Sequence, residues 1–235
     1  MHTCRVQIPR EQPRRSEPPT RRSPGRPPVP LDRIVATAMR IVDEEGAEAL
    51  SMRTLAKRLG SGTATLYRHF ENRSEVVAQV ADRLFGMIEV GPPPADTDWR
   101  EACRTMMESV FAVLRRHRNV APLLIEETPA GPNAMAVRER CVAILLDSGF
   151  PPKIAAQAYA TLARYVLGFA MQLGGQGTAD RSDEERARAA IRLAGPSQYP
   201  ATMRVADFIP VPLEDEFSFG LTLIIDGLSR FREDS

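Results

Sequence analysis

Three short helical segments follow one another between Leu31 and Phe70, and two sharp breaks separate them. The first segment ends at Gly46, and its apolar residues recur at the three- and four-residue spacing of one helix face. Those residues are Ile34, Val35, Ala38, Ile41 and Val42. Ser51 then stands where the N-cap of a second helix belongs. The buried side of that helix consists of Leu55, Ala56 and Leu59.

The second break is Gly60-Ser61-Gly62, where glycine tolerates the positive φ of a tight turn. The segment after it, Thr63 to Phe70, has room for about two helical turns. Its outward residues are small or polar, whereas Leu66 and Phe70 are expected in the core. The spacing therefore predicts a helix-turn-helix unit, whose third helix enters a DNA major groove with its first turn at the base edges.

The local charge agrees with this interpretation. Between Ser51 and Arg73 there are five cations, Arg53, Lys57, Arg58, Arg68 and Arg73, against the single acid Glu71. Neutralising phosphates releases counterions and supplies sequence-independent affinity for DNA. A three-helix bundle with a solvated basic face is the alternative, and charge alone does not separate the two.

The first 30 residues have a different composition from the rest of the chain. They hold seven arginines, two glutamates and eight prolines, without a periodic apolar pattern. We expect a disordered basic arm over residues 1–30. The run that ends in Gly25-Arg26-Pro27 resembles minor-groove arms, and a solvated tail is the alternative. The segment lacks the apolar core of a secretory signal.

The remaining chain predicts an all-α fold. A fourth helix is expected over about 72–89, followed by the break Gly91-Pro92-Pro93-Pro94. Further helices are expected at about 98–117, 121–127, 132–148, 151–174, 184–194 and 213–232. The stretch 199–212 is weakly patterned and is expected to be a surface connection. We assign residues 31–76 to the DNA-binding domain and residues 77–235 to a larger ligand-binding and dimerisation domain.

The N-terminal pattern resembles the Tet repressor family of bacterial transcription regulators. The resemblance rests on LSMRTLAKRLGSGTATLYRHFENRSEVV, and above all on TLYRHF followed by Asn72-Arg73. It extends through DWREACRTMMESVFAVLRRHRNVAPLL, YVLGFAMQ and FSFGLTLIIDGL, which resemble the tetracycline-repressor subgroup. It covers roughly residues 31–230. The resemblance implies a homodimeric, ligand-responsive repressor of a palindromic operator.

Several DNA contacts are predicted in the head. Threonine hydroxyls can bond bases or phosphates, and the methyl groups of threonine and alanine suit a thymine methyl. An arginine at the start of the second helix can read guanine or grip a phosphate. From the residues and the family positions together, the predicted DNA-binding residues are Arg53, Thr63, Ala64, Thr65, Tyr67, Arg68, His69 and Arg73.

The resemblance also bears on the effector. In the tetracycline repressors that this chain resembles, a histidine associated with magnesium corresponds to Leu124 here. An acidic residue from the partner subunit corresponds to Gln172. Leu124 offers no ligand to a hard cation, which needs oxygen donors. We therefore expect no metal or cofactor, and a small, mainly apolar effector in a cavity suited to a lipophilic compound. The predicted ligand-binding residues are Glu89, Met106, Met107, Val110, Leu124, Phe169 and Gln172.

Dimerisation is expected through the two longest C-terminal helices, about 151–174 and 213–232. Small residues on the first permit close helix approach, and the second carries an apolar stripe. The resemblance implies that these helices pair with their symmetry mates, whereas an ordinary intrachain core is the alternative. The predicted dimerisation residues are Tyr159, Leu162, Val166, Phe217, Leu221, Ile224, Ile225 and Leu228.

Cysteine and histidine usage suggests no catalytic or metal site. Cys4, Cys103 and Cys141 lack metal spacing, and the last two are expected as core residues in a cytoplasmic protein, with redox sensing the weaker alternative. His117 follows several cations at a helix end and is expected to complement the helix dipole. No apolar run approaches the roughly 20 residues of a membrane span.

Three functions remain to be weighed. A ligand-responsive repressor, with operator DNA, an effector and a second copy of the chain as partners, is the leading hypothesis. An architectural DNA-binding protein without an effector is the second, and it would show little operator preference. An enzyme using the helical cavity is the third, but the sequence contains no nucleophile elbow, phosphate loop or zinc spacing.

Overall fold

The computed structural model describes residues 29–92, 96–175, 181–193, 195 and 197–232. Within these ranges the chain forms helices and turns without a strand, which confirms the predicted all-α class. The basic arm expected over residues 1–30 lies outside them except for Val29 and Pro30. Among the described helices, none combines the length and the apolar character that crossing a membrane requires.

The head begins with α1 (Leu31–Glu45), the 3-10 turn η1 (Ala47–Ala49) and α2 (Met52–Leu59). The Ser51 hydroxyl accepts a hydrogen bond from the amide of Thr54 at 3.1 Å, which confirms Ser51 as the N-cap of α2. Gly60 ends α2 in the left-handed region with φ of 62°, where a side chain would be strained. The predicted turn between the two helices therefore forms for the expected reason.

The third helix is shorter than predicted. α3 spans only Thr63–Leu66 and gives way to hydrogen-bonded turns, in which the amide of Phe70 bonds the carbonyl of Leu66 at 3.0 Å. Leu66 and Phe70 are both buried, so the core contacts fall as predicted although the regular helix stops early. A segment this short depends on packing against α2 rather than on its own helix propensity.

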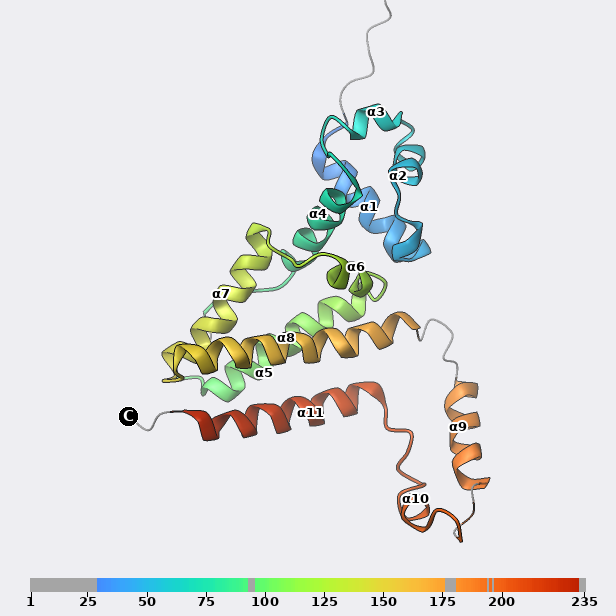
Figure 1. Ribbon diagram of the computed structural model, residues 1–235, viewed down its shortest axis with the longest axis vertical. Coiled ribbons are helices and arrows are strands. Elements are labelled where there is room, and N and C mark those ends of the chain that lie inside the picture. The colour runs from blue at the N-terminus through green and yellow to red at the C-terminus, as the bar shows by residue number, and fades with distance from the viewer. Residues whose placement is uncertain (1–28, 93–95, 176–180, 194, 196, 233–235) are drawn as a thin grey trace, which may run out of the picture.

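The fourth helix joins the head to the body. α4 spans Arg73–Phe85, and its N-cap Asn72 accepts from the amide of Glu75 at 3.0 Å. It ends before the predicted Glu89. Figure 1 shows α1–α3 at one end of the molecule, with α4 leading from them toward α7 and α6. Its buried residues are Val76, Val77, Val80, Ala81, Asp82 and Leu84.

The body follows the predicted helix pattern closely. Its helices are α5 (Trp99–Arg116), α6 (Ala121–Glu126), α7 (Pro132–Asp147), α8 (Pro152–Gly175), α9 (Arg181–Leu193), α10 (Pro200–Arg204) and α11 (Leu213–Leu228), before η2 (Ser229–Phe231). The difference is α10, which lies in the stretch expected to be a connection. Its five residues are too few to show a helical period, and a proline at its start is the one local signal.

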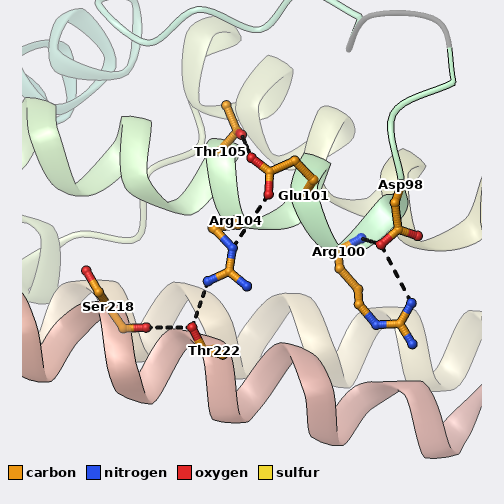
Figure 2. Close-up of polar contacts among 7 residues, drawn as sticks. All are labelled: Asp98, Arg100, Glu101, Arg104, Thr105, Ser218 and Thr222. Carbon is orange, nitrogen blue, oxygen red and sulfur yellow. Dashed lines mark hydrogen bonds and ion pairs between the residues drawn. The ribbon is translucent and has the colours of Figure 1, made fainter.

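The body packs around α8, which contacts α5, α7 and α11. In Figure 1, α8 and α11 run side by side along the body, while α9 and α10 stand to one side of it. A polar link joins α5 to α11, where the Arg104 guanidinium donates to the Thr222 hydroxyl at 2.7 Å (Figure 2). Buried apolar side chains form one continuous cluster from the head to α11, so the head is not an independent unit in its packing.

A buried carboxylate fastens α4 to α7. Asp82 accepts from the backbone amides of Asn133 at 2.9 Å and Ala134 at 3.1 Å, and from the Asn133 side-chain amide at 2.9 Å. These amides belong to the first turn of α7, whose own N-cap is Gly131 and carries no side chain. Asp82 therefore caps α7 from another helix and satisfies amides that its first turn leaves unbonded.

Gly131 makes this contact sterically possible. A Cβ placed on Gly131 would lie 2.3 Å from the nearer Asp82 carboxylate oxygen and 2.4 Å from its carboxyl carbon. Any side chain at this position would displace the carboxylate from the amides that it caps.

We therefore predict that Gly131→Ala lowers the free energy of unfolding by about 1–3 kcal/mol, through overlap and loss of the cap. The measurement is chemical denaturation followed by circular dichroism. Gly91→Ala is the matched control, because none of the residues that the structure describes lies within 4 Å of a Cβ placed there. Equal stability of the two variants would show that the Asp82 contact does not constrain residue 131.

Candidate functional site

The predicted recognition surface is exposed in the head. Thr63 and Ala64 are exposed at the start of α3, and Thr65 is half-buried. Tyr67 keeps 56% of its surface exposed, beside exposed Arg68 and His69, and Arg53 is exposed near the start of α2. The inward side of the same segment is filled by Leu66 and Phe70. Six of the eight predicted DNA-binding residues therefore lie on one accessible segment, 63–69, and Arg53 lies on α2.

The basic excess of this surface is smaller than the residue count indicates. Arg58 bonds Glu44 at 2.7 Å and also pairs with Glu45, both at the end of α1. The Arg58 hydrogen bond lowers the pKa of the Glu44 carboxyl from its ordinary value. The acidic pair thus neutralises one of the five cations, while Arg53, Lys57 and Arg68 have no carboxylate within salt-bridge distance among the described residues.

Arg73 is the predicted DNA-binding residue with the most intrachain contacts. Its Nε donates to the carbonyl of Leu50 at 2.7 Å, and Nη2 donates to the carbonyl of Ala47 at 3.3 Å. Its Nη1 bonds the Glu126 carboxylate, at the end of α6, at 2.6 Å. The guanidinium is therefore held inside the chain and connects the head to α6.

A second polar joint lies between the end of α1 and the turn after α5. His117 Nδ1 lies 3.0 Å from one Asp43 carboxylate oxygen and 3.1 Å from the other. The Asn119 side-chain amide donates to the Asp43 carbonyl at 2.9 Å. His117 is the C-cap of α5, as its predicted place at a helix end requires, and the structure adds the Asp43 partner that the sequence did not indicate.

The body contains a cavity of about 320 Å³ among α5, α6, α7 and α8. Most of its lining is apolar. The residues are Phe85, Met107, Val110, Leu114, Leu124, Thr128, Pro129, Ala134, Val137, Arg138, Cys141, Tyr159, Ala160, Ala163, Arg164, Val166 and Leu167. Size and character both suit a small organic ligand.

The predicted ligand-binding residues divide between several places. Met107, Val110 and Leu124 line this cavity. Glu89 and Met106 instead line a second cavity of about 270 Å³. Consecutive residues on a helix point about 100° apart, and here Met106 and Met107 face different cavities.

The other two predicted ligand-binding residues, Phe169 and Gln172, line neither cavity. The Phe169 ring lies against Tyr165 and Phe217, with ring centres 4.9 and 5.5 Å away. Gln172 is exposed near the end of α8.

Four polar residues of the main cavity were not predicted as ligand contacts: Thr128, Arg138, Tyr159 and Arg164. Tyr159 was predicted for dimerisation. An arginine in an amphipathic helix ordinarily indicates a solvated face, which is why Arg138 gave no signal. Arg164 gave a weak signal of a polar contact in the cavity, because it interrupts the apolar middle of α8.

Much of the predicted dimerisation stripe is core of the single chain. Five of the eight residues are buried within it, so they present no free surface to a partner: Leu162, Val166, Phe217, Leu221 and Ile225. Ile224 and Leu228 are partly buried against the same core. The apolar residues that α11 leaves exposed are Phe219 at 67% and Leu223 at 57%, one helical turn apart.

The two described cysteines are core residues. Burial raises the pKa of both thiols, Cys103 and Cys141, to about 12. Thiolates are the reactive form, so both side chains are poor nucleophiles near neutral pH. The structure describes no group of three or more His, Cys, Asp or Glu side chains placed to hold a metal ion. Cys4 lies outside the described residues.

Comparison with known proteins gives a match over both parts of the chain. Residues 34–80 match the model of the bacterial regulatory proteins of the tetR family. Residues 91–231 match the model of the tetracyclin repressor-like C-terminal domain. Together the two matches include the recognition surface, α4 as far as Val80, and most of the residues that line both cavities.

Individual relatives match this chain along most of their own length. The HTH-type transcriptional repressor DrrR1 of Streptomyces coeruleorubidus is 32% identical over 220 residues, or 89% of this chain and 82% of that protein. The tetracycline repressor protein class C of Escherichia coli is 27% identical over 202 residues, or 85% and 90%. The structure of ActR from Streptomyces coelicolor in complex with actinorhodin superposes with a TM-score of 0.80 at 32% identity, covering 89% and 99%.

Proposed function

The chain belongs to the tetR family of bacterial regulatory proteins, and we propose that it is a ligand-responsive repressor that binds a palindromic operator as a homodimer. The observation that carries the mechanism is the position of α4. This helix follows the recognition surface directly, and it is bonded to both α6 and α7, two walls of the main cavity.

DNA binding is assigned to the exposed residues of the head. Thr63, Ala64 and Thr65 open α3 and are placed to read base edges, while Tyr67, Arg68 and His69 are placed to reach phosphates or neighbouring bases. Arg53 approaches the same groove from α2. Arg73 takes a different role, because its three hydrogen bonds within the chain position the start of α4 against η1 and α6.

The cavity is the proposed effector site. Related proteins of this family include ActR, whose structure holds actinorhodin, and repressors named for tetracycline. Metal-assisted binding of a tetracycline does not suit this cavity, since the described residues of its lining include no histidine or carboxylate. A metal-independent organic effector with a large apolar surface fits the lining better.

Release from DNA follows from the contacts of α4. A ligand in the cavity touches the wall formed by Leu124 and Thr128 at and beyond the end of α6, and by Ala134 and Val137 on α7. Glu126 lies between Leu124 and Thr128 in the chain and holds Arg73, while α7 holds Asp82. A ligand that favours a different placement of these walls moves both attachment points of α4 and therefore moves the heads.

The proposed homodimer uses the outward face of α8 and α11. Phe219 and Leu223 on α11 lie one turn apart and are largely exposed in the single chain. On α8, a Cβ placed on Gly168 has no described residue of the chain within 4 Å, which leaves room for a close helix neighbour. Pairing through a two-fold axis would bury this apolar face and place two heads on one palindrome, in successive major grooves.

An architectural DNA-binding protein without an effector is less well supported, because it gives no role to the cavity or to the contacts between α4 and the cavity walls. Enzymatic use of the cavity has no support from the family, whose members are DNA-binding regulators.

We predict that Thr63→Ala with Thr65→Ala lowers the ratio of specific to nonspecific DNA affinity at least about tenfold, because base-edge contacts are lost while phosphate contacts remain. The measurement is fluorescence anisotropy with the duplex that the wild-type protein selects from a random pool, against a scrambled duplex of equal length. Thr105→Ala, an exposed threonine of α5, is the control. An unchanged ratio in the double variant would remove α3 from base recognition.

We also predict that Phe219→Glu with Leu223→Glu yields a folded monomer that loses operator affinity, since a two-fold interface would bury four carboxylates. Sedimentation velocity and circular dichroism together test this. Met87→Glu with Val90→Glu is the matched control, because both residues are apolar, exposed and distant in sequence from α11. A wild type that sediments as a monomer at micromolar concentration would contradict the proposed dimer.

A further inference from the structure

The main cavity carries an unbalanced charge. Among the lining residues that the structure describes are two arginines, Arg138 on α7 and Arg164 on α8, and no aspartate, glutamate or histidine. Neither arginine has a carboxylate within salt-bridge distance among the described residues. The second cavity differs, because its lining contains both Arg140 and Glu89.

Arg138 is held in a fixed orientation by neutral partners. Its Nε donates to the Tyr159 hydroxyl at 3.2 Å, and Nη2 donates to the Pro129 carbonyl at 3.1 Å. Nη1 contacts the Met135 sulfur at 2.9 Å, and the guanidinium carbon lies 5.9 Å from the centre of the Tyr159 ring. A guanidinium has five N–H donors, so these three contacts leave two donors unused. Because all three partners are neutral, they do not balance the positive charge of Arg138.

Tyr159 completes a polar corner of the cavity. Its hydroxyl oxygen accepts from Arg138, which leaves the hydroxyl proton to be donated elsewhere. No acceptor for that proton is found among the described residues of the chain. Arg138 and Tyr159 together offer donors to one ligand oxygen group.

Arg164 adds positive charge on the facing helix. Its Nη1 donates to the Ala160 carbonyl, one turn earlier on α8, at 3.3 Å, and the residue is otherwise exposed. The remaining walls are apolar, with Met107, Val110, Leu124 and Val166 among them. Charge-assisted hydrogen bonds in such partly dry surroundings are stronger than those between neutral groups.

We propose that the effector is an organic carboxylate with a large apolar body. Its carboxylate is bound by Arg138 and Tyr159, with Arg164 contributing charge, and its body fills the apolar part of the cavity. A planar guanidinium matches the two oxygens of a carboxylate, whereas a cation or a metal chelate would meet two positive charges here. This assignment rests on the proposed function, since it names the chemical class that the regulatory cavity selects.

The test uses a matched pair of fluorescent probes, anthracene-2-carboxylate and the neutral anthracene-2-carboxamide. Both are titrated into the full-length protein near neutral pH, where the acid is ionised. We expect the carboxylate to bind at least about tenfold more tightly, as a charged hydrogen-bonding group should. Equal affinities, tighter binding of the amide, or no binding of either probe would overturn the assignment.

Variants locate the bound carboxylate. Arg138→Gln should reduce carboxylate affinity about tenfold and leave amide affinity nearly unchanged, and Tyr159→Phe should cause a smaller loss. Arg138→Lys keeps the charge and should retain part of the preference, which separates loss of recognition from loss of folding. Arg140→Gln is the control on the same helix. A loss confined to Arg140→Gln would place the acid in the second cavity and overturn the assignment.

Release of DNA separates this inference from the proposed function. The wild-type protein is bound to the duplex that it selects from a random pool, and each probe is added at saturation. Release by the carboxylate and not by the amide is expected. Release by the amide alone would leave the repressor intact and contradict the acidic effector, whereas absence of sequence-selective DNA binding would instead contradict the proposed function.

Discussion

The contact on which the arrangement depends is the cap that Asp82 provides for α7. A buried carboxylate is costly unless donors surround it, and here two backbone amides and one side-chain amide do so. Because the cap comes from α4, the first turn of a cavity wall is completed by the helix that follows the DNA-binding head. The small size of Gly131 permits this approach.

The Arg73–Glu126 pair gives α4 a second attachment at its other end. Both side chains are about one-third exposed, so the pair contributes little to the free energy of folding. Its importance lies in position: Arg73 also holds the carbonyls of Leu50 and Ala47, so a displacement of α6 reaches η1 and the start of α2. A weak and exposed ion pair is suited to a conformational switch. A ligand that binds one of the two conformations only modestly more tightly than the other is then enough to break the pair.

Local features of the fold could be predicted from the sequence, and long-range ones could not. Ser51, Gly60 and the buried pair Leu66 and Phe70 follow from caps, turns and helical spacing within a few residues. The partners of Arg73 lie 23, 26 and 53 positions away, and no short pattern signals them. The partner of the apolar stripe on α11 could not be predicted for another reason. An amphipathic pattern indicates that a helix has an apolar face, but it does not indicate whether the same chain or a second copy covers that face.

The central claim, that the cavity controls the heads through α4, can be tested by measuring the distance between the two heads of the proposed dimer. A nitroxide on Ser74→Cys, in a Cys4→Ser background, labels α4 selectively, because the buried thiols of Cys103 and Cys141 have pKa values raised to about 12. Pulsed electron paramagnetic resonance then gives the distance between the two labels. Saturating anthracene-2-carboxylate should shift this distance by at least about 2 Å, and Asp82→Asn should reduce the shift. An unchanged distance in protein that the probe has released from DNA would contradict the role of α4.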